Sequence, residues 1–336
     1  MNLFLVTSPF QLICAIEAKN QFQSVRNILI LRLEKTLISQ QQMTLLLNPD
    51  DWDHIIYLGR RSKVWELRKL ISNLKKIQPN LSFQRLFYAD YSAWRTAVLL
   101  NNISVEQEIM IDDGVGTIRE FVDKIHPEKH VSRNKKSRDL ILRLCGLNSP
   151  RVIFPRENFS FFTFFTLNDC RFPIVENQFY TLRKQLSTNT CFDANGKIGF
   201  IGQGMVAIKG IEIDVYCELL ERLLMKHPKG IVYFPHRTEC EMVKTRLKNI
   251  PNLEYHNSSL PLELEIGTKQ IKLSALYGIA STAAVTIEKI YPDIPVWDIE
   301  VPIENYVIEE FGRNFHTVSH TLNIPKIKYA DLSFKE

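Results

Sequence analysis

The stretch EIMIDDGVGTIREF, residues 108–121, places two adjacent acids and a glycine after a short apolar run. The apolar run predicts a buried β-strand, and Gly114 suits the turn that follows it. The same order, a short apolar strand followed by a helical segment, recurs on both sides of this stretch. This alternation predicts parallel, doubly wound α/β sheets, in which ligands bind at the carboxyl ends of the strands.

The alternation runs through both halves of the chain but stops between them. Residues 122–160 are strongly basic, and the turn signal Asn195-Gly196 lies in a polar stretch, 187–197. Strands and helices then resume at residue 197. We therefore predict two Rossmann-like domains, 1–190 and 191–336, that face each other across a cleft.

The composition is that of a soluble globular protein, with 45% hydrophobic and 24% charged residues. The formal charge of +5 permits an anionic substrate or a membrane surface as partner, but it does not require nucleic acid. No apolar run is long enough to predict a transmembrane helix. The six cysteines form no CxxC pair, so we expect buried free thiols in a cytoplasmic protein and no zinc knuckle.

Asp112-Asp113-Gly114 follows a predicted strand, so its carboxylates should face a ligand cleft. Two adjacent carboxylates repel, and one can stay ionised as a general base while backbone donors hold the other. Capping of the next helix is an equally good explanation of the same residues. A metal site needs more oxygen ligands nearby, and the sequence offers no such cluster.

Pro235-His236-Arg237 stands between a strand and a helix in the second half. An imidazole at a helix N-terminus can bind or protonate a phosphate, and Arg237 adds a fixed positive charge. The alternative is a surface histidine that only caps the helix. Gly202-Gln203-Gly204 also follows a strand, where glycines allow a ligand to approach the backbone, although it is not a complete dinucleotide-binding motif.

Two further stretches in the second half carry polar groups at helix starts. Ser281 and Thr282 combine two hydroxyls with free backbone amides, which can bind a phosphate or simply cap the helix. In LPLELE, Glu263 or Glu265 can bind the hydroxyls of a ribose. Acids in the first turn of a helix are also common for the sake of the helix dipole alone.

Taken in order, these motifs resemble those of the bacterial sialyltransferases, especially the lipooligosaccharide sialyltransferases of glycosyltransferase family 52 and the related capsule polysialyltransferases. Those families carry an acidic-acidic-Gly motif, a His motif and a Ser/Thr motif. The resemblance spans VTSPFQL to ASTAAV and leaves residues 122–160 and the C-terminal tail unmatched. Many relatives have His-Pro where this chain has Pro235-His236.

The resemblance implies a GT-B fold and an inverting, metal-independent transfer of sialic acid from CMP-sialic acid to a hydroxyl of a glycan. Asp113 would be the base, supported by Asp112, and His236 would help CMP leave; Asp214 is a second candidate for the base. The implied donor-binding residues are Gly202, Gln203, Gly204, Pro235, Arg237, Glu263, Ser281 and Thr282. No cofactor or metal is expected.

Alternatives remain at two levels. The donor sugar could be pseudaminic acid or Kdo, the nucleotide could be UDP, or the protein could be a non-catalytic polysaccharide-assembly protein. The basic segment HVSRNKKSRD favours peripheral contact with an anionic inner-membrane surface or a lipid-linked glycan over nucleic acid. The acceptor sugar, the linkage and the number of sugars added do not follow from the sequence.

Overall fold

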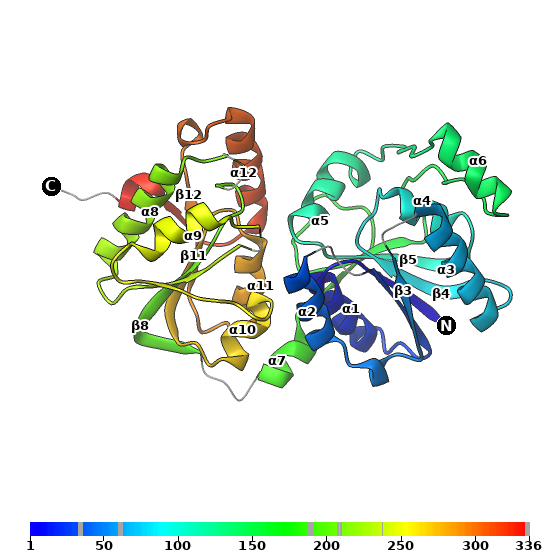
Figure 1. Ribbon diagram of the computed structural model, residues 1–336, viewed down its shortest axis with the longest axis horizontal. Helices are drawn as coiled ribbons and strands as arrows, with labels where there is room; N and C mark the ends of the chain where they lie inside the picture. Colours follow the sequence, from blue (N-terminus) through cyan, green and yellow to red (C-terminus); the bar gives the residue numbers. More distant parts are fainter. Residues whose placement is uncertain are drawn as a thin grey trace. The chain divides into compact units, whose positions relative to one another are not determined.

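The computed structural model describes residues 1–32, 36–59, 63–186, 191–206, 208, 210–236 and 238–332. The chain forms two compact units, Met1–Asn177 and Gln178–Glu336. Figure 1 shows a sheet flanked by helices in each unit. Within the described residues, no helix has both the length and the apolar character needed to cross a membrane. All six cysteines are free thiols, and Cys14, Cys191 and Cys217 are buried.

The first unit is built on a seven-stranded parallel sheet with the order β3-β2-β1-β4-β5-β6-β7. Every residue of β1 and β6 is buried, which is typical of a parallel sheet covered on both faces. The strands are β1 (Asn2–Val6), β2 (Asn27–Arg32), β3 (His54–Leu58), β4 (Ser82–Tyr88), β5 (Ser104–Ile111), β6 (Phe159–Thr163) and β7 (Ile174–Glu176). The helices are α1 (Pro9–Gln21), α2 (Leu37–Leu46), α3 (Lys63–Ile77), α4 (Trp94–Leu100), α5 (Val115–Glu120) and α6 (Lys136–Leu144).

The second unit is built on a six-stranded parallel sheet with the order β10-β9-β8-β11-β12-β13. Its strands are β8 (Phe192–Ile201), β9 (Ile231–Phe234), β10 (Leu253–Tyr255), β11 (Leu273–Gly278), β12 (Val296–Glu300) and β13 (Lys326–Lys328). Its helices are α7 (Tyr180–Leu186), α8 (Ile213–Lys226), α9 (Glu241–Lys248), α10 (Leu262–Thr268), α11 (Thr282–Ile290) and α12 (Glu309–Leu322).

The start of α1 illustrates how local sequence sets these elements. Ser8 has an extended backbone and its Oγ accepts a hydrogen bond from the N–H of Gln11, while Pro9 occupies the first helical position, where no N–H is needed. The chain therefore turns directly from β1 into α1. As a result, Gln11 lies one turn into the helix, at the carboxyl end of the strand.

The boundary between the units differs from the one expected at residue 190. The division falls between Asn177 and Gln178, and α7 belongs to the second unit, where the side chain of Leu186 packs against Gly267 of α10. Packing of this half-buried leucine outweighs the polar turn signal that follows it. The sequence also left open a C-terminal tail that crosses back to the first domain; as far as Leu332, the chain adds α12 and β13 to the second unit.

Candidate functional site

In the first sheet, the chain runs from β1 outward to β2 and β3 and then returns to the other side of β1 with β4. The strand order therefore reverses between β1 and β4. Such a switch point opens a crevice outside the carboxyl ends of the two strands, where ligands bind in open α/β sheets. Thr7 follows β1 and Asp90 follows β4, and Oγ1 of Thr7 lies 3.3 Å from Oδ2 of Asp90, to which it donates. The next strand, β5, delivers Asp112 and Asp113 to the same edge.

Asp113 is half-buried and is held from α1. Nε2 of Gln11 donates to its Oδ1 over 2.8 Å, and Oε1 of the same glutamine accepts from the N–H of Thr7 over 2.7 Å. Gly114 occupies the N-cap position of α5 with φ of 62°, and no side chain caps that helix. The N-cap position thus belongs to Gly114, and the hydrogen bond from Gln11 orients the carboxylate of Asp113.

Asp112 is fully buried and accepts two hydrogen bonds from the end of β6. Oγ1 of Thr163 donates over 2.7 Å and the N–H of Phe164 over 2.9 Å. Burial raises the pKa of Asp112 to about 7 against these hydrogen bonds, and the charge of Asp113 raises it further. The two adjacent acids thus have different roles: Asp112 fixes the neighbouring strand end, while Asp113 faces a small pocket.

That pocket has a volume of about 170 Å³. It is lined by residues that follow β4 and β5 and by residues in and just after α5: Ala89, Asp90, Asp113, Gly116, Arg119, Glu120, Asp123 and Lys124. Asp90 was not singled out from the sequence, although it ends a predicted strand, the same signal that pointed to Asp112. Burial raises the pKa of the Asp90 carboxyl group, and the hydroxyl of Thr7 opposes the rise. Four carboxyl groups therefore line one small pocket: Asp90, Asp113, Glu120 and Asp123.

The second sheet has its switch point between β8 and β11, since β9 lies on the other side of β8. Gly202 leaves no room for a side chain: an added Cβ would lie 2.6 Å from the hydroxyl of Tyr233 and 2.8 Å from the carbonyl of Phe234. Nε2 of Gln203 donates to the carbonyl oxygen of Ile279, which joins the loop after β8 to the turn after β11. The predicted glycine loop and the Ser-Thr turn are thus directly connected.

Ser281 is the N-cap residue of α11, but its side chain makes no capping hydrogen bond. Within the described residues, neither its hydroxyl nor that of Thr282 has a hydrogen-bond partner. The first backbone N–H groups of a helix also lack partners inside the helix. The start of α11 therefore offers a cluster of donors suited to an anion.

Asp298 of β12 fixes this turn and was missed from the sequence, where it is a lone acid in an apolar run. It is fully buried, and its Oδ1 accepts the N–H of Ala280 over 2.6 Å while the hydroxyl of Ser319 donates to its other oxygen. Ala280 has a φ of 44°, a strained value for a residue with a side chain. Asp298 stabilises that conformation, and burial raises its pKa.

His236 is half-buried beside the glycine loop, where an added Cβ on Gly204 would lie 2.7 Å from its Nδ1. Nδ1 accepts the N–H of Thr238 over 3.2 Å, so Nε2 is the nitrogen that carries the proton in the neutral ring. Cys240, and not His236, is the N-cap residue of α9. Pro235 links β9 to His236, while Arg237 lies outside the described residues.

A chain of hydroxyl groups runs beneath these two loops. The N–H of Gln203 donates to the hydroxyl of Tyr216, which lies 3.1 Å from the hydroxyl of Tyr233. Tyr233 donates to Glu239 over 2.5 Å, and Tyr255 donates to the same carboxylate over 2.6 Å. Each hydroxyl in this series thus donates in the direction of Glu239. The series connects the loop that contains His236 to the glycine loop through hydrogen bonds.

The acids of α10 face inward. Glu263 is 6% exposed, its Oε1 accepts from Oγ1 of Thr286 over 3.0 Å, and burial raises its pKa. Burial alone would raise the pKa of Glu265 too, but hydrogen bonds from His256 and the backbone N–H groups of Leu260 and Ser259 outweigh it and lower that pKa. Glu265 therefore holds the loop after β10, and the ribose-binding role of Glu263 stays a prediction.

Asp214 lies in the first turn of α8, where Glu212 is the N-cap residue. Its side chain is 81% exposed and forms an ion pair of 3.0 Å with Arg246 of α9. It belongs to the second unit, whereas Asp113 belongs to the first. The structure gives Asp113 a pocket and an oriented carboxylate, and it gives Asp214 an exposed ion pair.

One group of side chains in the described residues has the composition of a metal site: Glu300, His316 and His320. Nζ of Lys326 lies 3.0 Å from Nδ1 of His320, which therefore accepts a hydrogen bond and leaves the proton on Nε2. That protonated nitrogen is the one facing Glu300, at 4.0 Å. The N–H of His320 and the ammonium of Lys326 therefore occupy the side of each ring nitrogen where a cation would have to bind.

No family model and no curated protein matches the sequence of this chain. Among solved structures, UDP-GlcNAc 2-epimerase from Neisseria meningitidis, bound to UDP-GlcNAc, aligns with a TM-score of 0.52 and 9% identity over 89% of this chain and 82% of that one. The Methanocaldococcus jannaschii enzyme, in complex with UDP-GlcNAc and UDP, gives 0.51 and 8% over 96% and 93%. The fold is of the GT-B type. A glycosyl transferase family 9 protein from Veillonella parvula aligns at 0.41 and 11% over 88% and 80%.

The GT-B fold confirms the expectation of two Rossmann-like domains. At identities of 8–9%, the likeness shows the fold and leaves the chemistry to the residues of this chain.

Proposed function

We propose that the protein is an inverting glycosyltransferase that moves a sugar from a CMP-activated donor, CMP-sialic acid in the first instance, to a hydroxyl of a glycan in lipooligosaccharide or capsule synthesis. The observation that carries the proposal is the start of α11. There Ser281 and Thr282 present two hydroxyls that no described residue uses, at the switch point of the second sheet. Hydroxyls and helix N–H groups in such a place suit the phosphate of a nucleotide.

The departure of CMP requires that the charge developing on its phosphate be neutralised. Positioned donors are typically worth about 2.7–4 kcal/mol each in such a role. The Nε2–H of His236 and the hydroxyls of Ser281 and Thr282 are donors of this kind, and they need no metal ion. Gly202 lets the loop beside them pack directly against Tyr233 and Phe234, which fixes the position of its backbone.

The acceptor hydroxyl must lose one proton as its oxygen attacks the anomeric carbon of the donor. In this proposal Asp113 takes that proton, the new C–O bond forms, and the bond from the sugar to the CMP phosphate breaks. The hydrogen bond from Gln11 orients the carboxylate of Asp113, and the small pocket that this residue lines has room for a hydroxyl. A positioned general base of this kind typically contributes about 10²–10⁴-fold in rate.

We also propose peripheral contact with an anionic membrane through α6. That helix buries only Leu142, while Leu140, Ile141 and Leu144 are exposed beside basic residues. A basic helix with an exposed apolar face is typical of membrane-surface binding. Sedimentation with liposomes that contain anionic lipid, at low salt, tests this point, and the absence of binding contradicts it.

A second candidate is an enzyme that acts on a UDP-sugar. It is favoured by the likeness in fold to two epimerases whose structures contain UDP-GlcNAc. A thermal-shift panel of CMP, UDP and GDP, each with and without Mg²⁺, separates the two candidates. Stabilisation by CMP without metal supports the first proposal, whereas a preference for UDP or a requirement for Mg²⁺ overturns it.

A further inference from the structure

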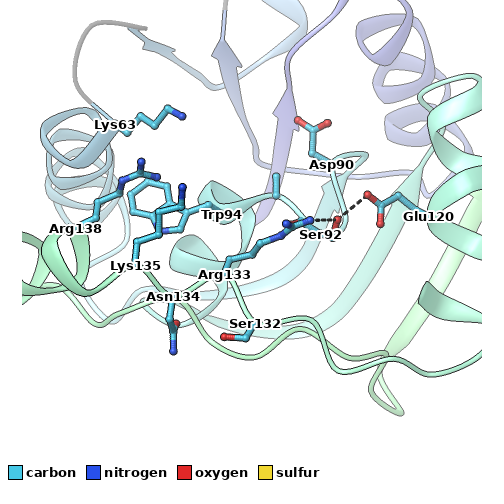
Figure 2. Close-up of a pocket in the computed structure, with 11 residues that line it drawn as sticks. Lys63, Asp90, Ser92, Trp94, Glu120, Ser132, Arg133, Asn134, Lys135 and Arg138 are labelled. Carbon is cyan, nitrogen blue, oxygen red and sulfur yellow. Dashed lines mark hydrogen bonds between the residues drawn. The ribbon is translucent and has the colours of Figure 1, made fainter. Parts of the chain in front are cut away.

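A second and larger pocket, of about 430 Å³, lies next to the one that contains Asp113. It is formed at the carboxyl end of β4, at the start of α3 and along the loop that leads into α6. Figure 2 shows a group of cationic side chains near the ring of Trp94, with two carboxylates farther along the lining. The cations are Lys63, Arg133, Lys135 and Arg138, and the carboxylates are Asp90 and Glu120.

Four cations and two carboxylates line this pocket, so its described lining carries an excess of positive charge. Within the described residues, the side chains of Lys63 and Lys135 form neither a hydrogen bond nor an ion pair. The charge of Arg138 is the main reason that the pKa of Lys63 is lowered, and Lys135 adds to the effect. Cations held this close repel one another, so an anion among them relieves the repulsion.

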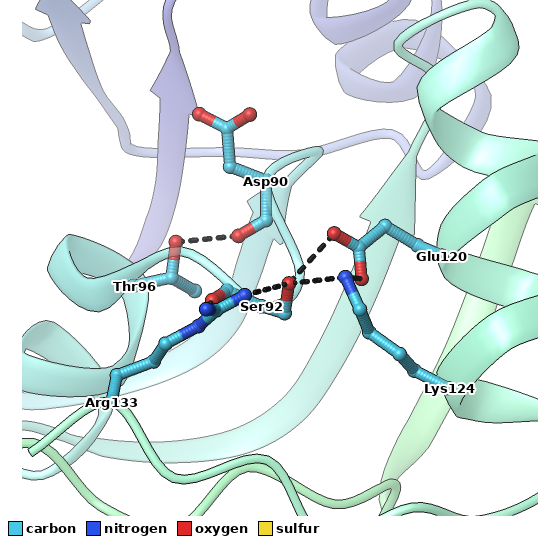
Figure 3. A network of polar contacts seen from close by, with 6 residues as sticks. All are labelled: Asp90, Ser92, Thr96, Glu120, Lys124 and Arg133. Atoms are coloured by element: carbon cyan, nitrogen blue, oxygen red, sulfur yellow. Dashed lines mark hydrogen bonds and ion pairs between the residues drawn. The ribbon is translucent and has the colours of Figure 1, made fainter.

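Arg133 is fixed in place before any ligand binds. Its Nε donates to the carbonyl of Ser92 over 2.7 Å and its Nη2 to the hydroxyl of Ser92 over 3.1 Å. Figure 3 shows that Ser92 is in turn held by Glu120 and Lys124. A side chain anchored in this way loses little freedom when it binds an anion.

The rest of the lining suits a sugar. The guanidinium of Arg138 lies 4.9 Å from the ring centre of Trp94, and the indole provides an apolar face against which the C–H groups of a pyranose can pack. The carboxylates of Asp90 and Glu120 can accept hydrogen bonds from sugar hydroxyls. A volume of about 430 Å³ lies within the range of sites for small ligands.

We propose that this pocket binds a phosphorylated sugar, with the phosphate among Lys63, Lys135 and Arg138 and the sugar hydroxyls toward Asp90 and Glu120. We further infer that this sugar belongs to the acceptor, a step that rests on the proposed function. The two pockets share Asp90 and Glu120 in their linings, and the smaller one contains Asp113. A sugar anchored by its phosphate therefore extends a hydroxyl toward the base.

Calorimetric titration of the full-length protein with glucose 6-phosphate, with CMP at saturation, tests the site. Saturating CMP keeps the phosphate probe out of the donor site. The double variant Lys63→Gln, Lys135→Gln removes two cations of the pocket, and the matched control Lys75→Gln, Lys136→Gln removes two exposed cations that do not line it. We expect binding at least about tenfold weaker in the first variant, because each lost contact is charge-assisted, and unchanged binding in the control.

Equal losses of affinity in the two variants overturn the proposal, because they show that only the net charge of the protein matters for binding. Binding of glucose as tight as that of glucose 6-phosphate overturns it as well. Binding to vesicles that contain phosphatidic acid is measured in a second experiment. If the vesicles bind through Lys63 and Lys135 while glucose 6-phosphate does not bind, the pocket is a site for a lipid headgroup, and the proposal of a sugar phosphate is wrong. If CMP raises the melting temperature but glucose 6-phosphate does not bind, this inference is wrong and the donor proposal stands. If glucose 6-phosphate binds but CMP does not raise the melting temperature, only the donor proposal is wrong.

Discussion

Replacing Asp112 with asparagine removes a carboxyl group from the core while keeping its hydrogen bonds. The carboxylate accepts hydrogen bonds from Oγ1 of Thr163 and the N–H of Phe164, and it also interacts with the side chain of Thr117. An asparagine carbonyl can accept from Phe164, and its amide can donate to the threonine hydroxyl. The variant therefore loses the ionisation and little else.

The magnitude follows from the pKa of Asp112, which burial raises from 3.8 to about 7. Below the lower value the group is protonated in both states, between the two values only in the folded state, and above the upper value in neither. The free energy of unfolding of the wild-type protein thus falls as the pH rises through this range. The fall is ~1.4 kcal/mol per pH unit and roughly 4 kcal/mol in total.

Urea denaturation of both proteins, followed by tryptophan fluorescence, measures the difference. Three of the four tryptophans, Trp52, Trp65 and Trp94, lie in the first unit, so Trp297→Phe in both proteins restricts the signal to that unit. A separate signal matters because two units need not unfold as one transition.

Between about pH 5 and about pH 7, the Asp112→Asn variant should gain roughly 2–3 kcal/mol relative to wild type. Other buried carboxyl groups are present in both proteins and cancel from the comparison. Parallel stability curves, or a variant that loses stability relative to wild type as the pH rises, would show that Asp112 stays ionised in the folded state and would refute the reasoning.

Three more predictions concern the site. Asp113→Asn should lower kcat by about 10²–10⁴-fold while Asp214→Asn leaves it unchanged; steady-state kinetics giving the reverse pattern assign the base to Asp214. Asp298→Ala removes the acceptor of the backbone N–H just before Ser281, so urea denaturation should show a loss of ~1–3 kcal/mol in the second unit, and a neutral result contradicts the role of Asp298. The double variant Ser281→Ala, Thr282→Val should weaken CMP binding by roughly tenfold in calorimetry without loss of stability, since neither hydroxyl caps α11; unweakened binding argues against this phosphate site.

The fold was predictable because its signals are local. The apolar runs NLFLVT, RNILILRL, HIIYLG, FQRLFYAD and EIMI each predict a strand, and each forms one. The stretch KVWELRKLISNLKKI predicts a helix over 63–77, and α3 has those bounds. The helix α2 was missed because LISQQQMTLL has a weak apolar face that buries only Ser39 and Met43. The missed helix α12 had a readable signal, two glutamates in the first turn and an amphipathic pattern.

The candidate site was predictable as a set of strand ends but not as a set of contacts. Capping and ligand binding look alike in sequence at Asp113 and Ser281, and only the observed partners separate them. For Asp113 that partner is Gln11, 102 residues away. Asp298 was missed for the same reason: its acceptor role depends on a turn that belongs to a different strand.

The chain of hydroxyls from Gln203 to Glu239 has a consequence for variation and engineering. A methyl group at Gly202 displaces the ring of Tyr233, and the shift breaks the hydrogen bond that holds the loop of His236. The glycine loop and the loop of His236 are therefore constrained to change together. A larger residue at position 202 requires a smaller one at position 233, and Glu239 then needs a new hydrogen-bond donor. Redesign of either loop has to change these positions together.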